Sequence, residues 1–267
     1  MAQGKVDTFP RGAGINFRCL MSKLLLLGAP EGLSITLDFN SWTTGPLFKG
    51  IKNIPSGIHY ITTNLDQVFG RSGFFIDGSN DLNTWQWIDA LGRFDKVTDQ
   101  DQISRIKMGM HEIELGLGPY PMNLYESWKL HSNFLSTNLL YKICPDNFTD
   151  TVASSSRLSD VADPRIQKSP TINFTVIDLK HSFPVGTQGA LRSKYAMDKS
   201  WLLKKLISSS SAEEILGEIQ LSFLMFILGQ FYDGYEQWKI LIHLICNSEQ
   251  ILEEDSGFFT EFTSIYC

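Results

Sequence analysis

Histidine and cysteine are the residues of this sequence whose side chains best suit metal binding or proton transfer. His243 and Cys246 stand three residues apart in a stretch with helical periodicity, so both side chains could face one metal ion. A structural zinc site needs four ligands, and the sequence offers no second pair at a suitable spacing. We therefore interpret the pair as a buried thiol beside a histidine on the flank of a helix, and we expect no metal and no cofactor.

The other histidines are far apart in the sequence, at His59, His111, His131 and His181. Folding could still bring them together with Cys246, so a metal-dependent hydrolase stays open as an alternative function. The sequence lacks the GxSxG turn of serine hydrolases and a P-loop lysine in a strand-turn-helix context. No catalytic set emerges, and we expect a protein that is not an enzyme.

Four consecutive serines, Ser208, Ser209, Ser210 and Ser211, are candidate sites of regulatory phosphorylation. A phosphate there would sit at a helix N-terminus and add about −1.5 to −2 charges, which could recruit an arginine of a partner or repel an acidic surface. The plainer interpretation is a flexible serine linker that ends in a helix cap. Phosphorylation is therefore a hypothesis that rests on the run of serines alone.

A helical hairpin over residues 211–248 is the segment around which we expect the chain to be organised. Ser211 and Glu214 have the spacing of a capping box, in which side chains at a helix start bond free backbone N–H groups. A helix should begin there, become apolar on nearly every side and end near Gly229. A helix of that kind must be buried by its neighbours.

The second helix of the hairpin has the same start signal, because Asp233 and Glu236 repeat the capping spacing. In the first helix, Glu213, Glu214 and Glu218 are acidic residues in the first turns, where they oppose the positive end of the helix dipole. Capping explains these carboxylates better than acid–base catalysis does.

The first half of the chain has a different period. Leu33, Ile35 and Leu37 alternate with polar residues, which places them on one face of a strand, and further short strands follow with turn residues between them. Helical spacing over residues 99–117 and beyond Tyr125 predicts flanking helices. The fold class is α+β, with a β-rich amino-terminal domain, an antiparallel barrel or sandwich, followed by an all-α carboxy-terminal domain.

We divide the chain into a loose tail over residues 1–21, the β-rich domain over residues 22–149, a flexible linker over residues 150–170 and the helical domain over residues 171–267. The linker is rich in Ser, Asp and Pro and poor in large apolar residues, so burial cannot repay its ordering entropy. Residues 172–179 then predict a strand or an extended segment that enters the helical domain.

Charge and composition argue against several classes of function. The formal charge of −6 and the pI near 5.4 oppose broad binding to a phosphate backbone, which needs clustered Lys and Arg. The apolar run over residues 221–228 is much too short to cross a bilayer, which needs about 20 residues. The four cysteines are scattered without a CxxC, so we expect neither a disulfide framework nor a zinc knuckle, and free thiols suit the cytosol or nucleus.

Aromatic residues are abundant in the first half of the chain, and they leave a second alternative open. They could stack on the bases of single-stranded RNA, although such sites normally include a basic groove. Core filling and contact with a protein partner are the favoured interpretations. The residues concerned are Trp42, Phe48, Phe74, Phe75, Trp85 and Trp87.

Short motifs along the chain resemble, in order, those of the Aar-two cistron-splicing factor family. In the first half they are DFNSW at 38–42, GPLFKGIK at 45–52, IPSGIH at 54–59, GFF at 73–75 and PYP at 119–121. In the second half they are MDKS at 197–200, LGEIQ at 216–220, FILGQ at 226–230 and EQWK at 236–239. The resemblance spans both predicted domains.

The resemblance implies a non-enzymatic assembly factor for the U5 snRNP, with no cofactor, that acts in mRNA splicing. Members of the family hold the large scaffold protein of that particle, contact its RNase-H-like region, and give way to the RNA helicase as the particle matures. The implied setting is the cytoplasm and the nucleus, among other snRNP proteins, without direct binding to nucleic acid or membrane. The family also implies a β-rich first domain and a helical second domain.

Two departures from the family pattern accompany this resemblance. Residues 1–21 match none of its motifs. Family members also continue through further helices and a tail, whereas this sequence stops at Cys267, so we expect a carboxy-terminally truncated form. If the further helices of family members pack against the hairpin at 211–248, their absence here would leave apolar surface of the hairpin exposed. Part of the contact with the partner would then be weakened.

Overall fold

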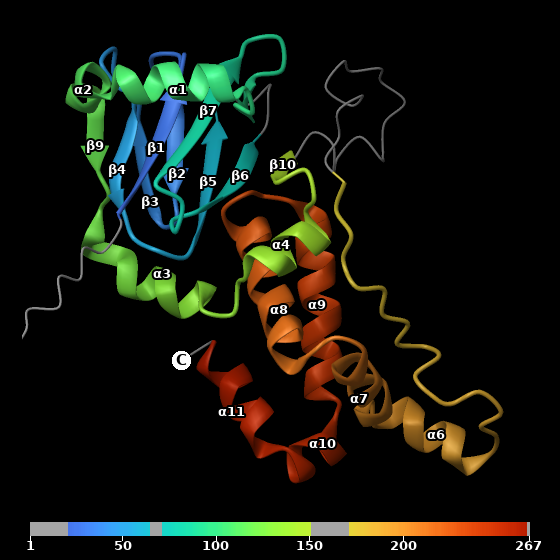
Figure 1. Cartoon of the computed structure of the whole chain (residues 1–267). Coiled ribbons are helices and arrows are strands. Elements are labelled where there is room, and N and C mark those ends of the chain that lie inside the picture. The colour runs from blue at the N-terminus through green and yellow to red at the C-terminus, as the bar shows by residue number, and fades with distance from the viewer. Residues whose placement is uncertain (1–20, 65–70, 151–170, 266–267) are drawn as a thin grey trace, which may run out of the picture.

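The computed structural model describes residues 21–64, 71–150 and 171–265 of the chain. Figure 1 shows the strands at one end of the molecule, with the helices at residues 100–113 above them and the remaining helices below. The α+β prediction is confirmed, with a β-rich part followed by an all-helical part. Apart from Met21 and Asp150, the predicted tail and the predicted linker lie outside the described residues.

Two five-stranded sheets make up the β-rich part. The first has the strand order β8-β7-β1-β4-β9, and the second has the order β10-β6-β5-β2-β3. The strands of the first sheet are β1 Ser22–Leu27, β4 Gly50–Ile54, β7 Leu82–Ile88, β8 Arg93–Lys96 and β9 Leu117–Pro119. Those of the second are β2 Ser34–Leu37, β3 Asn40–Thr43, β5 Ile58–Asn64, β6 Ser72–Asp77 and β10 Phe148–Asp150.

The space between the two sheets is filled by side chains from both, as the period-two pattern predicted. Leu33, Ile35 and Leu37 are fully buried there, together with Phe74 and Trp85, whose rings stack with their centroids 3.9 Å apart. This arrangement is a sandwich. The antiparallel prediction holds for the second sheet, but β1–β7 and β4–β9 in the first sheet are parallel pairs.

The helix predicted over residues 99–117 is divided into shorter pieces: α1 Gln100–Met108, α2 Met110–Ile113 and the 3-10 turn η1 Glu114–Gly116. Asp99 caps α1 by accepting a hydrogen bond from the backbone N–H of Asp101, and Gly109 ends it. Gly116 then lies so close to the backbone oxygen of Leu47 that a Cβ would be 2.5 Å away. The chain passes from helix to β9 at this point of close approach.

The remaining helices of the first part lie below the sheets in Figure 1, after the 3-10 turn η2 Met122–Leu124. They are α3 Tyr125–Ser132 and α4 Thr137–Ile143. The helical part then contains α6 Ala190–Met197, α7 Ser200–Ser209, α8 Ala212–Ile227, α9 Tyr232–Cys246, α10 Glu249–Glu254 and α11 Ser256–Ser264. Between the two groups, residues 172–179 are extended and pair with no strand among the described residues.

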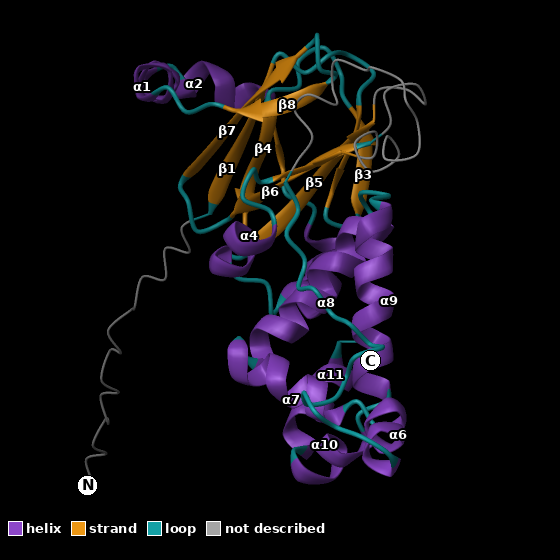
Figure 2. Cartoon of the chain, turned by 90° about the vertical axis from the view of Figure 1, so that its right-hand side faces the viewer, coloured by secondary structure: helices purple, strands orange, loops and turns teal. Residues whose placement is uncertain are grey.

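The predicted hairpin is α8 and α9, which pack along each other in Figures 1 and 2. Ser211 caps α8 as predicted, because its side chain accepts a hydrogen bond from the backbone N–H of Glu214. The second capping prediction is wrong. The residue before α9 is Phe231, whose side chain cannot cap the helix. Asp233 already lies inside the first turn of α9 and is therefore not at the capping position.

A shared hydrophobic core joins the sheets to the hairpin. Tyr60 and Phe75 of the second sheet, Trp128 of α3, and Leu221 and Met225 of α8 are all buried in one cluster. The close packing of the hairpin requires glycines in α8 and in the turn after it. A Cβ on Gly217, the glycine of α8, would be 2.5 Å from the backbone oxygen of Phe134. The two parts are therefore packed against each other directly.

Candidate functional site

The four candidate serines occupy three different structural positions. Ser208 and Ser209 form the end of α7, Ser210 alone stands between the helices, and Ser211 is the cap of α8. The interpretation as a flexible linker is therefore wrong, because two of the serines are helical. The run is a tight junction between two helices, and it is called the serine junction below.

Hydrogen bonds distinguish the serines further. The hydroxyl of Ser208 donates to the backbone oxygen of Lys204 at 2.8 Å, and that of Ser209 donates to the oxygen of Leu206 at 2.9 Å. Both bonds stay within α7, and both serines are exposed. Within the described residues, neither hydroxyl bonds an element other than α7.

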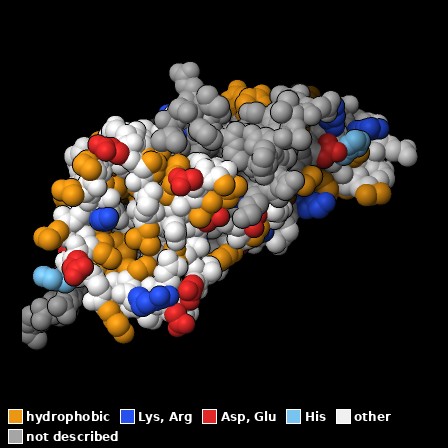
Figure 3. All heavy atoms as spheres, turned by 90° about the horizontal axis from the view of Figure 1, so that it is seen from above, with side chains coloured by type: hydrophobic (Ala, Val, Ile, Leu, Met, Phe, Trp, Pro, Cys, Tyr) orange, Lys and Arg blue, Asp and Glu red, His pale blue; other side chains and the backbone are white. Residues whose placement is uncertain are grey.

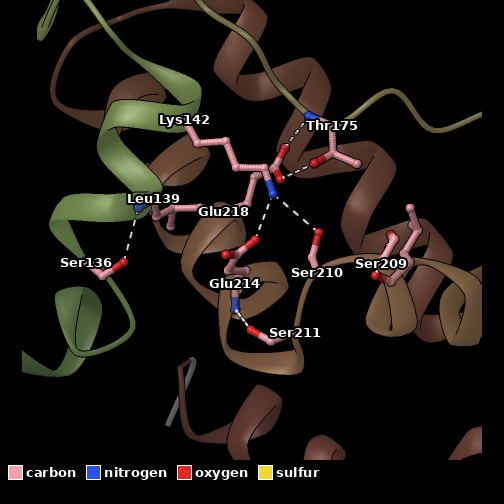
Figure 4. A network of polar contacts seen from close by, with 10 residues as sticks. Ser136, Leu139, Lys142, Thr175, Ser209, Ser210, Ser211, Glu214 and Glu218 are labelled. Atoms are coloured by element: carbon pink, nitrogen blue, oxygen red, sulfur yellow. Dashed lines mark hydrogen bonds and ion pairs between the residues drawn. The ribbon is translucent and has the colours of Figure 1, made fainter.

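Ser210 instead meets a lysine from the β-rich part, as Figure 4 shows. The ammonium of Lys142, on α4, donates to the hydroxyl of Ser210 at 3.3 Å and to the carboxylate of Glu214 at 2.7 Å. The lysine thus links α4 to the start of α8. It is the cation in the network drawn in Figure 4, so it is the group that a phosphate on Ser210 would attract.

The two helix dipoles create a potential of opposite sign at the two ends of the serine junction. The C-terminus of α7 carries partial negative charge, which disfavours an anion at Ser208 or Ser209. The N-terminus of α8 favours an anion near Ser211, although Glu213 and Glu214 already stand there. The prediction that a phosphate would sit at a helix N-terminus therefore fits only the last part of the run.

Beneath the junction, the carboxylate of Glu218 is buried and accepts three hydrogen bonds. Thr175 donates from its backbone N–H at 2.8 Å and from its hydroxyl at 2.6 Å, and Gln237 of α9 donates at 2.8 Å. Gln237 also donates to the backbone oxygen of Thr175 at 2.9 Å. Glu218 therefore fastens the extended segment at 172–179 to the hairpin, and the interpretation as a residue that opposes the helix dipole is wrong.

Sequence reasoning missed Lys142 and Thr175, although the two residues that bond Thr175 lie in recognisable motifs. Glu218 and Gln237 lie in two of the motifs quoted above, so a buried polar pair could have been suspected at these positions. Nothing in the sequence around Lys142 links it to residues about seventy positions later. That contact depends on the packing of α4 against α8, which periodicity does not reveal.

The histidines are not brought together. His59 is buried within the β-rich part, His131 is half-buried, and His111, His181 and His243 are exposed. Among the described residues, no group of three or more His, Cys, Asp or Glu side chains is placed to hold a metal ion. A hydrolase assembled from these residues therefore has no observation in its favour.

Cys246 is exposed at the end of α9, so the expectation of a buried thiol beside His243 is wrong. The buried residues near the end of α9 are Leu241, Leu244 and Ile245, whereas Cys246 is exposed. A one-residue step of about 100° along a helix is enough to move a side chain from core to solvent. His243 lies on the solvent side as well.

His59 belongs instead to a buried polar network. Its Nδ1 lies 2.7 Å from a carboxylate oxygen of Asp38, and its Nε2 lies 2.9 Å from the backbone oxygen of Pro55. Tyr120 donates to the same carboxylate at 2.6 Å, and the backbone N–H of Tyr60 donates to its other oxygen at 3.1 Å. Each ring nitrogen of His59 therefore lies at hydrogen-bond distance from an oxygen of the fold.

Burial and the neighbouring Asp38 carboxylate raise the pKa of Tyr120 far above its ordinary value, since both favour the protonated phenol. Asp38 itself stands in the left-handed backbone region, with φ of 54°, in the turn between β2 and β3. The network therefore holds that turn against β5 and Tyr120. With Asp38 and His59 only 1 % exposed, it is closed to a substrate.

Both parts of the chain match known protein families. Residues 21–145 match the family described as the AAR2 N-terminal domain, and residues 174–266 match the AAR2 C-terminal repeat region. The chain belongs to the AAR2 family. The resemblance drawn from the motifs is thereby confirmed.

Relatives in the AAR2 family include animal and yeast proteins. The chain is 27% identical to the human AAR2 homolog over 282 residues, which cover 91% of the chain and 73% of the relative. It is 24% identical to the Caenorhabditis elegans homolog, with 91% and 76% covered. It is 22% identical to the Saccharomyces cerevisiae protein named A1 cistron-splicing factor AAR2, with 86% and 72% covered.

In this AAR2-family chain the aromatic residues of the β-rich part belong to the core. Phe74, Phe75, Trp85 and Trp87 are buried, so their rings are not available to stack on nucleic-acid bases. Trp42 and Phe48 are half-buried and border an apolar pocket of about 260 Å³ near β9. The core-filling interpretation is confirmed for the four buried rings.

The face of the AAR2-family chain seen in Figure 3 is mixed in charge. On the face seen in Figure 3, Lys and Arg side chains are scattered among acidic ones and do not gather into a basic groove. Among the described residues, no helix has the length and apolar character needed to cross a membrane.

Proposed function

We propose that this chain is a splicing factor that works by stoichiometric binding and performs no reaction. The observation that carries the proposal is the match of both halves, in order, to the two AAR2 families, one of whose relatives is named a cistron-splicing factor. The buried His59 network supports the non-enzymatic part. Its polar groups are committed to the fold and closed to solvent.

The finer proposal concerns the partner. The chain binds the large scaffold protein of the U5 snRNP at its RNase-H-like region, in the cytoplasm and nucleus, and blocks premature association of the helicase, as an assembly chaperone does. The chain can exclude the helicase only if it binds the scaffold with a more favourable free energy than the helicase does. A difference of about 1.4 kcal/mol corresponds to a tenfold preference. The motif resemblance supports this partner.

Affinity purification tests the proposal directly. The tagged full chain is recovered from nuclear and from cytoplasmic extract, and bound proteins are identified by mass spectrometry. We expect the U5 scaffold without the helicase. Recovery of the helicase together with the scaffold would refute the blocking role, and absence of spliceosomal proteins from both extracts would refute the function as a whole.

A purified competition assay separates binding from exclusion. The RNase-H-like region of the scaffold is immobilised, saturated with the chain, and then challenged with the helicase at rising concentration. We expect helicase capture to fall in proportion to the chain bound. A labelled single-stranded RNA added without protein partner tests the RNA-binding alternative, for which we expect no retention even at low salt.

We further propose that phosphorylation at the serine junction regulates partner binding, with Ser210 as the most suitable position. Lys142 lies within hydrogen-bond distance of Ser210 and also pairs with Glu214. A phosphate on Ser210 would compete with Glu214 for the lysine and add repulsion between two anions at the start of α8. This would change how α4 and α8 are linked, and with it the surface that the two parts present together.

A further inference from the structure

A pocket of about 400 Å³ lies between α4 and the strands β6, β7 and β8 of the β-rich part. Figure 2 shows α4 below β6. The volume falls within the range of pockets that bind small ligands, about 300–1,000 Å³. The pocket belongs neither to the serine junction nor to the buried His59 network, and its apolar walls include Phe75, Trp85 and Leu140.

Trp85 lines this pocket and carries a hydrogen-bond donor that the described fold does not use. Its side chain is 2% exposed, and its Nε1–H has no hydrogen-bond partner in the part of the chain that the structure describes. The indole groups of two other tryptophans are paired, Trp87 with the carboxylate of Asp89 at 2.9 Å and Trp128 with the oxygen of Ile58 at 3.0 Å. A buried donor without an acceptor is rare in native proteins and needs an explanation.

Lys96 brings a second unused donor to the same wall. It is the direct antiparallel partner of Trp85 across β7 and β8, and side chains of such a pair stand on the same face of the sheet. That face is the inner one, since the neighbouring pair Trp87 and Phe94 is buried on it. Lys96 therefore points to the open end of the sandwich, and within the described residues no hydrogen bond or ion pair engages its ammonium.

Two carboxylates at the pocket wall are engaged with the fold. Asp77 accepts hydrogen bonds from the backbone N–H of Ser79 and the hydroxyl of Thr137, and Asp146 accepts one from the backbone N–H of Thr171. The Trp85 indole and the Lys96 ammonium are donors at this wall that no such bond engages in the described part of the chain. Two carboxylates at the wall also oppose a ligand with several negative charges.

We propose that this pocket binds a monocarboxylate with an apolar body, presented as a free acid or as an acidic residue next to an apolar one in a peptide. The apolar body packs against Phe75 and Leu140, and the carboxylate accepts hydrogen bonds from the Trp85 indole and the Lys96 ammonium. This site is independent of the proposed splicing function.

The test follows the indole N–H signals of the ¹⁵N-labelled full chain by NMR during titration with 4-phenylbutyrate. Trp85→Phe assigns the Trp85 signal. We expect that signal to move downfield and to saturate with a Kd of about 1 mM, the range that ligand efficiency allows for a ligand of this size. The amine and the alcohol of the same carbon skeleton should bind at least about ten times more weakly, because they lack the charged acceptor.

Two variants complete the test. Lys96→Gln, at an exposed position, should weaken 4-phenylbutyrate about tenfold without loss of folding, whereas the matched control Trp87→Phe should leave affinity unchanged because that indole is already paired. A peptide arm compares acetyl-Leu-Phe-Asp-amide with its Asn counterpart. Preference for the Asp peptide over the free acid identifies a peptide as the source, and the reverse identifies a small acid.

Several results would overturn the proposal. Equal binding of the acid, the amine and the alcohol would show that the pocket is merely apolar. An unmoved Trp85 signal at saturating acid, or unchanged affinity in Lys96→Gln, would show that the two donors do not hold the ligand.

Discussion

At the scale of single residues, the molecule contains polar groups of two kinds. Asp38, His59 and Tyr120 satisfy one another in the interior, whereas Lys142 and Ser210 meet at the surface between the two parts. The first kind determines stability, because a buried group that loses its partner costs about 1–3 kcal/mol. The second kind contributes little to stability and is free to serve regulation.

Tyr120→Phe tests the interior network. The variant keeps the ring, which packs edge-on against His59, and removes one hydrogen bond to the Asp38 carboxylate. We expect the free energy of unfolding to fall by about 1–3 kcal/mol in urea denaturation. Tyr232→Phe is the control, since its hydroxyl bonds Glu236 at the exposed surface, and a loss there as large as at Tyr120 would contradict the argument.

The pH dependence of stability should reveal the same network. Burial raises the pKa of both Tyr60 and Tyr120 above the ordinary value near 10, so the unfolded chain releases these protons first as pH rises. Stability from these phenols is complete below about pH 10 and is lost progressively above it.

Urea denaturation at about pH 8 and about pH 11 measures this loss. The double variant Tyr60→Phe, Tyr120→Phe should lose less stability between the two conditions than the parent chain. Burial lowers the pKa of Lys199, which acts in the opposite direction but equally in both proteins, so the comparison isolates the tyrosines. An equal loss in both would count against the two phenols as the cause.

Aspartate substitutions separate the positions of the serine junction. Ser208→Asp places a negative charge at the C-terminal end of α7 and should lower the free energy of unfolding by about 0.3–1 kcal/mol. In Ser210→Asp the new carboxylate gains Lys142 as a partner, so the loss of unfolding free energy should be smaller. Thermal unfolding measures both, with Ser210→Asn as the neutral control. Binding to the scaffold should change in Ser210→Asp and remain unchanged in Ser208→Asp, and the opposite pattern would sink the proposed regulation.

At the scale of elements, sequence patterns located several strands, among them β2, and the hairpin, but not the contacts between them. Alternation of Leu33, Ile35 and Leu37 sufficed for β2, and the capping box at Ser211 sufficed for α8, because both are local signals. The parallel pairs, the serine junction and the outward side of Cys246 depend on tertiary packing. Of the candidate site, the sequence predicted the serines but not the lysine that they meet.

The extended segment at residues 172–179 illustrates this limit, because within the described part of the chain it has no strand partner and forms no helix. One of its polar attachments is Glu218, whose carboxylate accepts from Thr175 and Gln237. The backbone N–H of Asn173 also donates to the oxygen of Ile143, and Lys199 donates to the oxygen of Leu179. The sequence of this segment has a strand pattern. At Thr175 its hydrogen bonds go to buried side chains of α8 and α9, where a strand would bond a neighbouring strand.

Glu218→Gln tests this attachment. The amide would place a donor where three donors already converge, so we expect a loss of about 1–3 kcal/mol and faster hydrogen exchange at the amide of Thr175. Glu213→Gln, exposed in the first turn of the same helix, is the matched control and should change stability by under about 1 kcal/mol. Unchanged exchange at Thr175 would show that other contacts hold the segment.

At the scale of the whole molecule, the shared core makes the two parts one packed unit. Side chains of β5, β6, α3, α4 and α8 are buried in a single cluster, and Arg71 donates to the backbone oxygen of Leu228 at the end of α8. We propose residues 150–170 as the linker between the two domains. The two domains are then held together by the interface in the shared core and not by the linker.

A cleavable chain tests this interface. A specific protease site is inserted between Ser156 and Arg157, and the cut chain is passed over a sizing column. We expect the two fragments to elute together, held by the shared core. The same cut in a Gly217→Ala background should release them, because the added Cβ would lie 2.5 Å from the backbone oxygen of Phe134. Separation of the parent fragments would contradict the argument.

The shared core also decides how contact sites in this protein can be mapped. A fragment corresponding to either family match alone would expose Tyr60 and Phe75, or Leu221 and Met225, to water, and would be prone to misfold or aggregate. A deletion that abolishes capture of a partner would then report collapse of the remaining half and not the removal of a contact. Single exchanges of surface side chains in the intact chain are the sound way to locate what it touches.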